Sequence, residues 1–300
     1  MFRLLNVFIS KASGGHKTLN NDLLFPFIVN LIEKTMISVF DMFSIGIGPS
    51  SSHTVGPMRA GREFCLQLKE QQLFAQTDAI KVELFGSLGQ TGKGHGTGKA
   101  VILGLLGHAP ESIDVSLVDA LLQEVDKEQT LSLNGEKPVS FSREGAIVFH
   151  RRKTLPLHAN GLTFHAISQK QIIASQSFYS IGGGFILRAE DFHQEKISAL
   201  LHDEKPVPYS FSSATQLLSL CKEHDLRISS LMLMNEQVFQ TQSEIKQKLW
   251  HIWQVMQECV QNGIRNEGIL PGGLKVTRRA PKLFRRLQNE RSTDPMQAMD

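Results

Sequence analysis

Hydrophobic and polar positions follow two different periodicities in the first half of the chain. Apolar and polar residues alternate over 79–85, which predicts a half-buried strand. Apolar residues recur at helical spacing over 57–69, and Pro57 suits the first turn of a helix because its missing N–H costs nothing there. Further helices are predicted at 100–106 and 111–127.

The second half changes from strands to helices. Strands are predicted around 145–150, 162–168 and 170–180. Helices are predicted at 214–224, 231–240 and 242–262, with Ser212 or Ser213 capping the first and Ser229 or Ser230 the second. The pattern indicates the α+β class: an N-terminal mixed α/β domain, followed by the start of a mainly helical domain.

Composition and charge narrow the class of protein. The 300 residues are 41% hydrophobic and 20% charged, as in an ordinary globular chain. The net charge of +3 reflects a basic stretch at 275–286, which we interpret as a connector; no aromatic stacking platform accompanies it, so we expect no nucleic-acid partner. No apolar run approaches membrane-spanning length, so we expect no membrane partner. The three scattered cysteines favour a reducing, cytoplasmic location.

A serine-rich run, GPSSSHTVGP, directly precedes the predicted helix at 57–69. The start of a helix exposes unpaired N–H groups and a partial positive charge, which favour a bound carboxylate or phosphate. A plain helix cap is the simpler interpretation, but four hydroxyls and a histidine exceed what a cap requires. We therefore predict an anion site here, formed by Ser50, Ser51, Ser52, His53 and Thr54.

The glycine-rich stretch GSLGQTGKGHGTGK at 86–99 fits neither common nucleotide-binding pattern. Its Gly-Lys pairs lack the preceding glycine and following hydroxyl of a P-loop, and Lys99 stands where the dinucleotide fingerprint needs glycine. We predict a flexible loop between strand and helix. It presents a cation, an acid–base group and a hydroxyl in Lys93, His95 and Thr97.

Weaker candidates have structural interpretations. His158 lies in a predicted turn beside Asn160-Gly161, and the glycines at 182–184 predict a bulge, a hinge or a close backbone approach. Cys259 is in register with the apolar face of the helix at 242–262, which predicts a buried core thiol.

Six ordered blocks carry a family resemblance: MISVFDMFSIGIGPSSSHTVGPMRAG, GSLGQTGKGHGTGKA, LPLHANG, YSIGGGF, MNE and EGILPGGLKVTRRAP. From about Met36 onward the chain resembles the bacterial iron–sulfur-dependent L-serine dehydratases of the single-chain type. The resemblance implies an extension at 1–35, a beta domain at 36–190, a linker at 191–207 and a partial alpha domain at 208–300. The beta domain is similar in fold to the allosteric substrate-binding domain of some phosphoglycerate dehydrogenases.

The resemblance also implies an activity. The family converts L-serine to pyruvate and ammonia, is expected to work as a homodimer, and uses a [4Fe–4S] cluster held by three cysteines as a Lewis acid. Carried over by residue, His53, His95 and Lys93 are the catalytic candidates. The substrate-binding candidates are Ser50, Ser51, Ser52, Thr54 and Thr97.

Two features depart from the family pattern. Gly98 stands where the family loop has an acid, and none of the three cysteines falls in a cluster motif. We therefore expect the cluster ligands downstream of Asp300, no cluster in this chain alone, and an inactive N-terminal fragment of the enzyme. A non-catalytic serine-sensing module is the alternative, and an RNA-binding protein is a third, weaker one.

Overall fold

The computed structural model describes residues 38–43, 45–192, 206–270 and 275–289. These residues fall into two compact units. One contains 38–192 and the described residues from 240 onward, and the other contains 206–239. The expected extension at 1–35 lies outside the described residues, as does most of the expected linker at 191–207.

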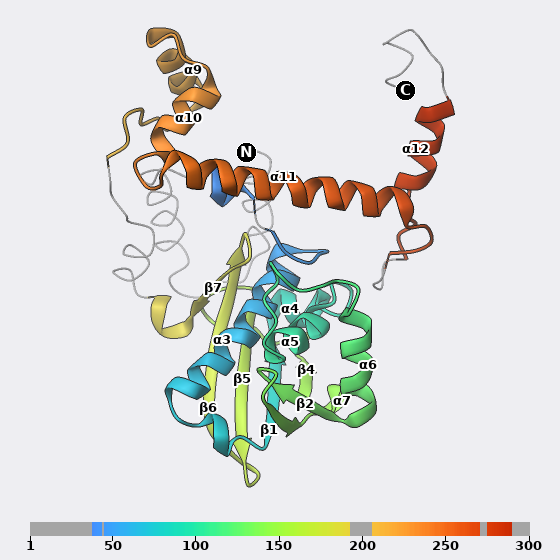
Figure 1. The fold of residues 1–300 in the computed structure, drawn as a ribbon. Coiled ribbons are helices and arrows are strands. Elements are labelled where there is room, and N and C mark those ends of the chain that lie inside the picture. Colours follow the sequence, from blue (N-terminus) through green and yellow to red (C-terminus); the bar gives the residue numbers. More distant parts are fainter. Residues whose placement is uncertain (1–37, 44, 193–205, 271–274, 290–300) are drawn as a thin grey trace. The chain divides into compact units, whose positions relative to one another are not determined.

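A seven-stranded mixed sheet forms the centre of the first unit (Figure 1). Strand β1 lies inside it, parallel to β3 and β4 along one edge and antiparallel to β5 along the other. The order is β2-β3-β1-β5-β6-β7, with β4 beside β1. The strands are β1 (Ala79–Leu84), β2 (Thr130–Leu133), β3 (Lys137–Ser140), β4 (Ile147–Phe149), β5 (Gly161–Ser168), β6 (Gln171–Gly182) and β7 (Phe185–Arg188).

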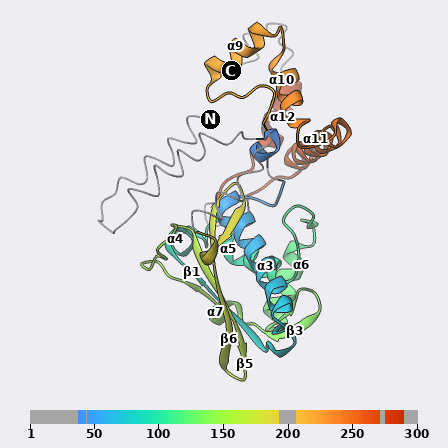
Figure 2. The same ribbon diagram turned by 90° about the vertical axis from the view of Figure 1, so that its left-hand side faces the viewer.

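Helices α3 (Gly56–Glu70), α5 (Thr97–Leu105) and α6 (Val118–Glu128) lie on one side of this sheet (Figure 2). The apolar core lies between these helices and the sheet, and it includes Met58, Phe64, Ile102 and Phe164. Helices α3 and α5 approach closely at two glycines, because a Cβ on Gly104 would overlap the carbonyl oxygen of Met58.

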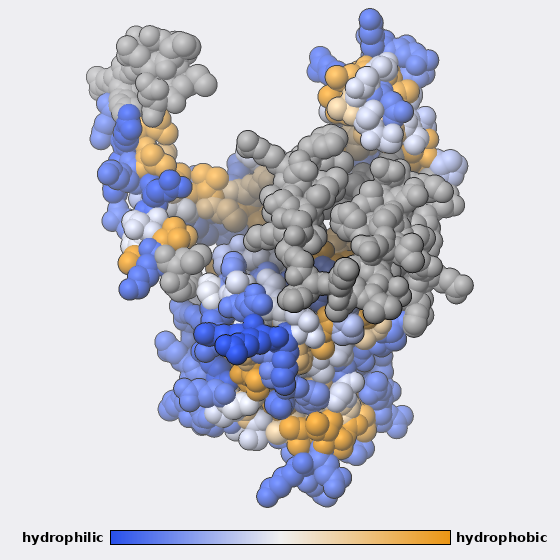
Figure 3. Space-filling view, turned by 180° about the vertical axis from the view of Figure 1, so that it is seen from behind, coloured by the Kyte–Doolittle hydropathy of each residue, from blue (hydrophilic) through white to orange (hydrophobic). Residues whose placement is uncertain are grey.

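The other side of the sheet is more polar. Along β1 the core-facing positions are buried, while the alternate positions, which include Lys81 and Glu83, stay partly exposed. Seen from behind, the domain shows a largely hydrophilic surface with smaller hydrophobic patches (Figure 3). The sheet therefore buries one face and presents polar side chains on the other.

A short helix, α7 (Arg143–Ala146), precedes β4. The helices after the sheet are α9 (Ala214–Glu223), α10 (Ile228–Glu236), α11 (Gln242–Arg265) and α12 (Ala280–Asn289). Ser213 caps α9 as predicted, but α10 begins at Ile228 with Arg227 as its N-cap, so the predicted serine cap is wrong. Thr241 and Glu244 form a capping box on α11. The basic stretch at 275–286 is partly helical, since α12 starts at Ala280. None of the described helices is long and apolar enough to cross a membrane.

The α+β class is confirmed, but besides the α10 cap several local predictions are wrong or incomplete, and the helix expected at 111–127 begins only at Val118. Residues 86–91 form the short helix α4 (Gly86–Thr91) and not a loop. The hairpin β2–β3 and strand β7 were not predicted. Cys259 is exposed on α11, because most of the apolar side chains on that helix lack a covering partner among the described residues.

Candidate functional site

The serine-rich run forms one helical turn, Ser51–Val55, that continues directly into α3. Ser50 precedes it in an extended conformation and caps it: its side-chain oxygen accepts from the N–H of His53 at 3.2 Å, and its carbonyl accepts from Thr54 at 3.0 Å. The first N–H groups of a helix have no partner inside it, and the Ser50 side chain satisfies the one of His53.

Both ring nitrogens of His53 are hydrogen bonded. Ser52 Oγ lies 2.9 Å from Nδ1, and Ser87 Oγ lies 3.0 Å from Nε2. Ser87 stands at the start of α4, so its hydroxyl joins the glycine-rich segment to the serine-rich turn. Sequence reasoning missed Ser87, although it follows the glycine that ends the alternation of β1.

Buried hydroxyls hold the two segments together. Thr54 Oγ1 donates to the carbonyl of His95 at 3.0 Å, and Thr97 Oγ1 donates to the carbonyl of His53 at 2.6 Å. Both threonines are buried, at 3% and 0% exposure. As a result the His53 and His95 rings lie side by side, with centroids 4.8 Å apart.

His95 is held in one tautomer. Its Nδ1 lies 3.0 Å from the carbonyl oxygen of Thr91, which can only accept a hydrogen bond, so Nδ1 carries the proton. In the neutral ring, Nε2 is then left with a lone pair that can take up a proton.

Two predicted residues stand apart from this network. The ammonium of Lys93 lies 5.4 Å from the ring centroid of Phe149, a cation–π arrangement. Ser51 is exposed, and its carbonyl accepts from Gly56 N–H inside the turn. Of the eight predicted residues, the described contacts therefore join six: Ser50, Ser52, His53, Thr54, His95 and Thr97.

The loop before β5 fixes the position of Ser87. The N–H of Ser87 donates to the carbonyl of Ala159 at 2.8 Å, and Gly86 N–H donates to Lys153 at the same distance. Gly86 has φ +55°, and a Cβ there would overlap the Ala159 carbonyl, so only glycine fits this position. In the same loop burial lowers the pKa of His158, whose Nδ1 accepts from the N–H of Asn160 at 3.1 Å.

The glycines at 182–184 form the turn between β6 and β7. The register of the β6–β7 pair shifts between Ser180 and Gly182, which fits the bulge, one of the three alternatives named for these glycines. The buried hydroxyl of Ser180 lies against the Cα of Gly56 and has no hydrogen-bond partner among the described residues. This contact locks the start of α3 onto the sheet.

The cysteines do not fit an iron–sulfur cluster. Cys65 is buried in α3, Cys221 lies on α9 and Cys259 on α11. Burial raises the pKa of the Cys65 thiol to about 12, so it is protonated at neutral pH and unsuited to bind iron. Within the described ranges no three histidine, cysteine or acidic side chains form a metal-binding group.

Comparisons with known proteins give a consistent result. The serine dehydratase beta chain family model matches residues 38–191, and the serine dehydratase alpha chain model matches 223–299. An L-serine dehydratase of Streptomyces coelicolor is 46% identical over 255 residues, covering 85% of this chain and 55% of the relative. L-serine dehydratase 1 of Escherichia coli is 43% identical over 268 residues, covering 88% and 58%.

A more distant relative, an L-serine dehydratase of Helicobacter pylori, is 35% identical and covers 88% of this chain and 57% of its own length. The chain thus spans a little over half the length of these relatives. The beta-chain model covers more than half of the 300 residues. Its range coincides with the sheet domain, residues 38–192, which contains the hydrogen-bonded residues between Ser50 and Thr97. The chain therefore belongs to the serine dehydratase beta chain family.

Proposed function

We propose that this chain supplies the substrate-binding part of an L-serine dehydratase and binds the carboxylate of L-serine at the Ser50–Thr54 turn. The observation that carries the proposal is the pairing of a capped helix start with His53, which is held from both sides by Ser52 and Ser87. Three curated relatives named L-serine dehydratase support the choice of serine as the anion.

We divide these residues into three groups. We assign Ser50, Ser51 and Ser52 to the carboxylate and His53 and His95 to proton handling near the substrate. Thr54 and Thr97, whose hydroxyls bond backbone carbonyls, position the two segments. The catalytic role expected of Lys93 stays a prediction.

The whole reaction would release pyruvate and ammonia from L-serine in the cytoplasm, in a homodimer with beta and alpha domains at about 36–190 and 208–300. A [4Fe–4S] cluster would supply a Lewis acid for the departing hydroxyl. The described cysteines do not fit such a cluster, so its ligands would have to come from outside residues 1–300.

A serine-sensing module is the second candidate. It is favoured by one observation: the described hydrogen bonds of His53 join it to Ser52, Ser87 and Thr97, which all belong to the sheet-containing unit. Binding without turnover is the property that would distinguish it from the enzyme.

Titration with L-serine tests the proposal. A single charge-assisted site for a small zwitterion supports a millimolar Kd, roughly −4 kcal/mol. We expect chemical-shift changes at 50–54 and 87–97, no binding by His53→Ala, and binding about three- to tenfold weaker in Ser87→Ala, the effect of losing a hydrogen bond worth about 1 kcal/mol.

His108→Ala, a histidine outside the site, is the matched control and should bind normally. Unchanged affinity in a folded His53→Ala protein would exclude His53 from the site. Pyruvate formation after supply of iron and sulfide would favour the enzyme, and binding without pyruvate would favour the sensor.

A further inference from the structure

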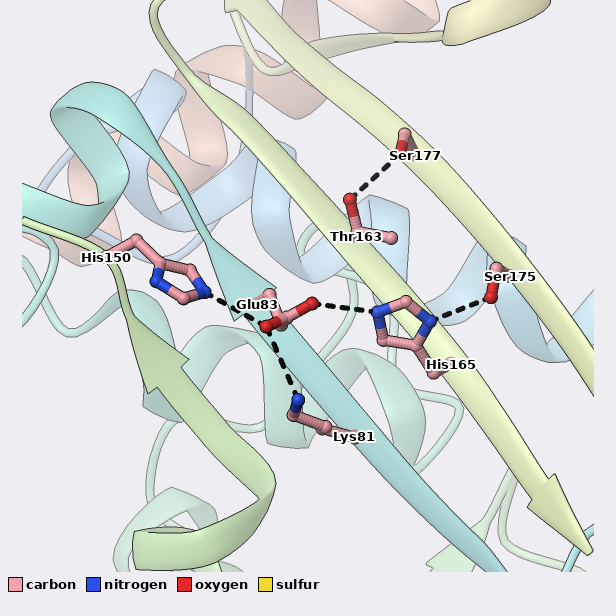
Figure 4. Close-up of polar contacts among 7 residues, drawn as sticks. All are labelled: Lys81, Glu83, His150, Thr163, His165, Ser175 and Ser177. Atoms are coloured by element: carbon pink, nitrogen blue, oxygen red, sulfur yellow. Dashed lines mark hydrogen bonds and ion pairs between the residues drawn. The ribbon is translucent and has the colours of Figure 1, made fainter. Parts of the chain in front are cut away.

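A second polar cluster lies on the open face of the sheet (Figure 4). Its centre is Glu83 on β1. Glu83 Oε2 lies 3.0 Å from Nε2 of His165 on β5, and Oε1 lies 3.0 Å from Nε2 of His150, just after β4. The Lys81 ammonium lies 3.4 Å from Oε1.

The cluster extends from His165 to a hydroxyl. His165 Nδ1 lies 2.7 Å from Oγ of Ser175, which faces it across the β5–β6 pair. The His165 side chain is 13% exposed and Glu83 21%, whereas Ser175 is exposed. A shielded carboxylate and imidazole thus lead to a hydroxyl that solvent reaches.

The charge of Glu83 determines which atoms donate and which accept in this chain of hydrogen bonds. Partial burial raises its pKa, but hydrogen bonds from His150 and His165 and the Lys81 charge outweigh this and lower it to about 2. The ionised carboxylate can only accept, so Nε2 of His165 donates to it. In the neutral ring, Nδ1 is then the acceptor and the Ser175 hydroxyl is the donor.

Carboxylate, imidazole and hydroxyl therefore stand in the order found in serine hydrolases, with the two ring nitrogens exchanged. We propose that Ser175 is a nucleophilic hydroxyl and a site of covalent modification by activated acyl esters. This site is independent of serine binding at the Ser50–Thr54 turn.

The reaction is an ordinary acyl transfer. The Ser175 oxygen forms a bond to the acyl carbon while its proton passes to Nδ1 of His165. The ester's alkoxide or phenolate leaves and takes that proton, giving acyl-Ser175 and the free alcohol or phenol. Glu83 stays ionised and stabilises the transient imidazolium.

The same strand contains a reference hydroxyl. Ser177 lies two residues further along β6, on the same face of the sheet, and its Oγ is 2.8 Å from Thr163 Oγ1 on β5. It has a hydroxyl neighbour where Ser175 has a histidine. The two serines therefore differ in two ways: Ser175 has a neighbouring base, and it is also more exposed. Variants of His165 and Glu83 distinguish the effect of the base from the effect of exposure.

The test is acetylation of the whole chain by p-nitrophenyl acetate, mapped by peptide mass spectrometry. A general base contributes about 10²–10⁴-fold, so we expect Ser175 to react about a hundredfold faster than Ser177. His165→Gln should bring Ser175 down to about the rate of Ser177, and Glu83→Gln should slow it at least about tenfold by disturbing the His165 tautomer.

Ser177→Ala should leave acetylation of Ser175 unchanged, and circular dichroism checks that each variant is folded. Equal rates at Ser175 and Ser177 in the unmodified chain would overturn the proposal without any variant. Undiminished acetylation of Ser175 in folded His165→Gln would overturn it as well, because exposure alone would then explain the reaction.

Discussion

Glu83 links the stability of the sheet domain to pH. Its pKa lies near 2 in the folded chain, against an ordinary value of 4.5. A carboxyl whose pKa is lowered by folding contributes stability above its unfolded pKa, and that contribution is lost as the pH falls. The window for Glu83 therefore runs from about pH 4.5 down to about 2.

The variant Glu83→Gln should flatten this pH dependence. Solvent screening reduces the contribution of a partly exposed group, so we expect Glu83→Gln to lower the unfolding free energy at neutral pH by on the order of 1–2 kcal/mol. Urea unfolding should show that the unfolding free energies of the unmodified chain and of Glu83→Gln differ less at pH 3 than at pH 6. Glu70→Gln, on the exposed last turn of α3, serves as the control. If the unfolding free energy of both proteins fell equally between pH 6 and pH 3, the pH dependence could not be assigned to Glu83.

At single residues, sequence reasoning found most of the candidate site but not its connections. The density of hydroxyls around His53 was visible in SSSHT, and the described contacts join six of the eight predicted residues. Ser87 was missed because its role depends on the loop at 153–159, which lies far away in sequence and holds the start of α4. No local pattern contains that information.

At the scale of elements, long and strongly patterned segments were predictable. Helices α3 and α11 and strands β1 and β5 match their patterns closely. Helix α4 was missed because two glycines give GSLGQT a low helix propensity, so tertiary contacts must hold it. The β2–β3 hairpin did carry a signal: Asn134-Gly135, both with positive φ, forms its turn.

The crossing of α3 and α5 gives a sharp test of packing. Gly104→Ala would place a methyl group onto the Met58 carbonyl and force the helices apart, which should cost about 1–3 kcal/mol or more of unfolding free energy. Gly98→Ala in the same helix meets its nearest neighbours, Ile147 and Phe149, at 3.5 Å, an ordinary contact. It should be neutral or stabilise by up to about 1 kcal/mol, because alanine favours helix.

Urea unfolding of both glycine variants gives the comparison directly. Equal stability of the two proteins would mean that the helices can separate at little cost, contrary to the close approach at Gly104 and at Gly61, where a Cβ would lie 2.9 Å from the Val101 carbonyl oxygen.

For the whole molecule, the cysteine distribution makes a prediction about metal. Cys65 is buried and protonated, and the other two cysteines lie on separate helices. Anaerobic reconstitution of this chain with iron and sulfide should therefore leave far less than one cluster per chain, measured as bound iron and acid-labile sulfide. About four irons per chain would show that the cysteines can assemble a site.

The central place of β1 also has a consequence for synthesis on the ribosome. Strand β1 pairs with β5, β4 and β3, and its partners in β5 lie about eighty positions later in the chain. Strand pairing across such separations is slow, because the chain loses entropy on closing a long loop before any stabilising contact forms. Until β5 has left the ribosome, the apolar side of α3 and β1 has no complete sheet to cover it. The nascent chain should then depend on chaperone protection through this interval, and pausing of synthesis just before β5 should increase aggregation.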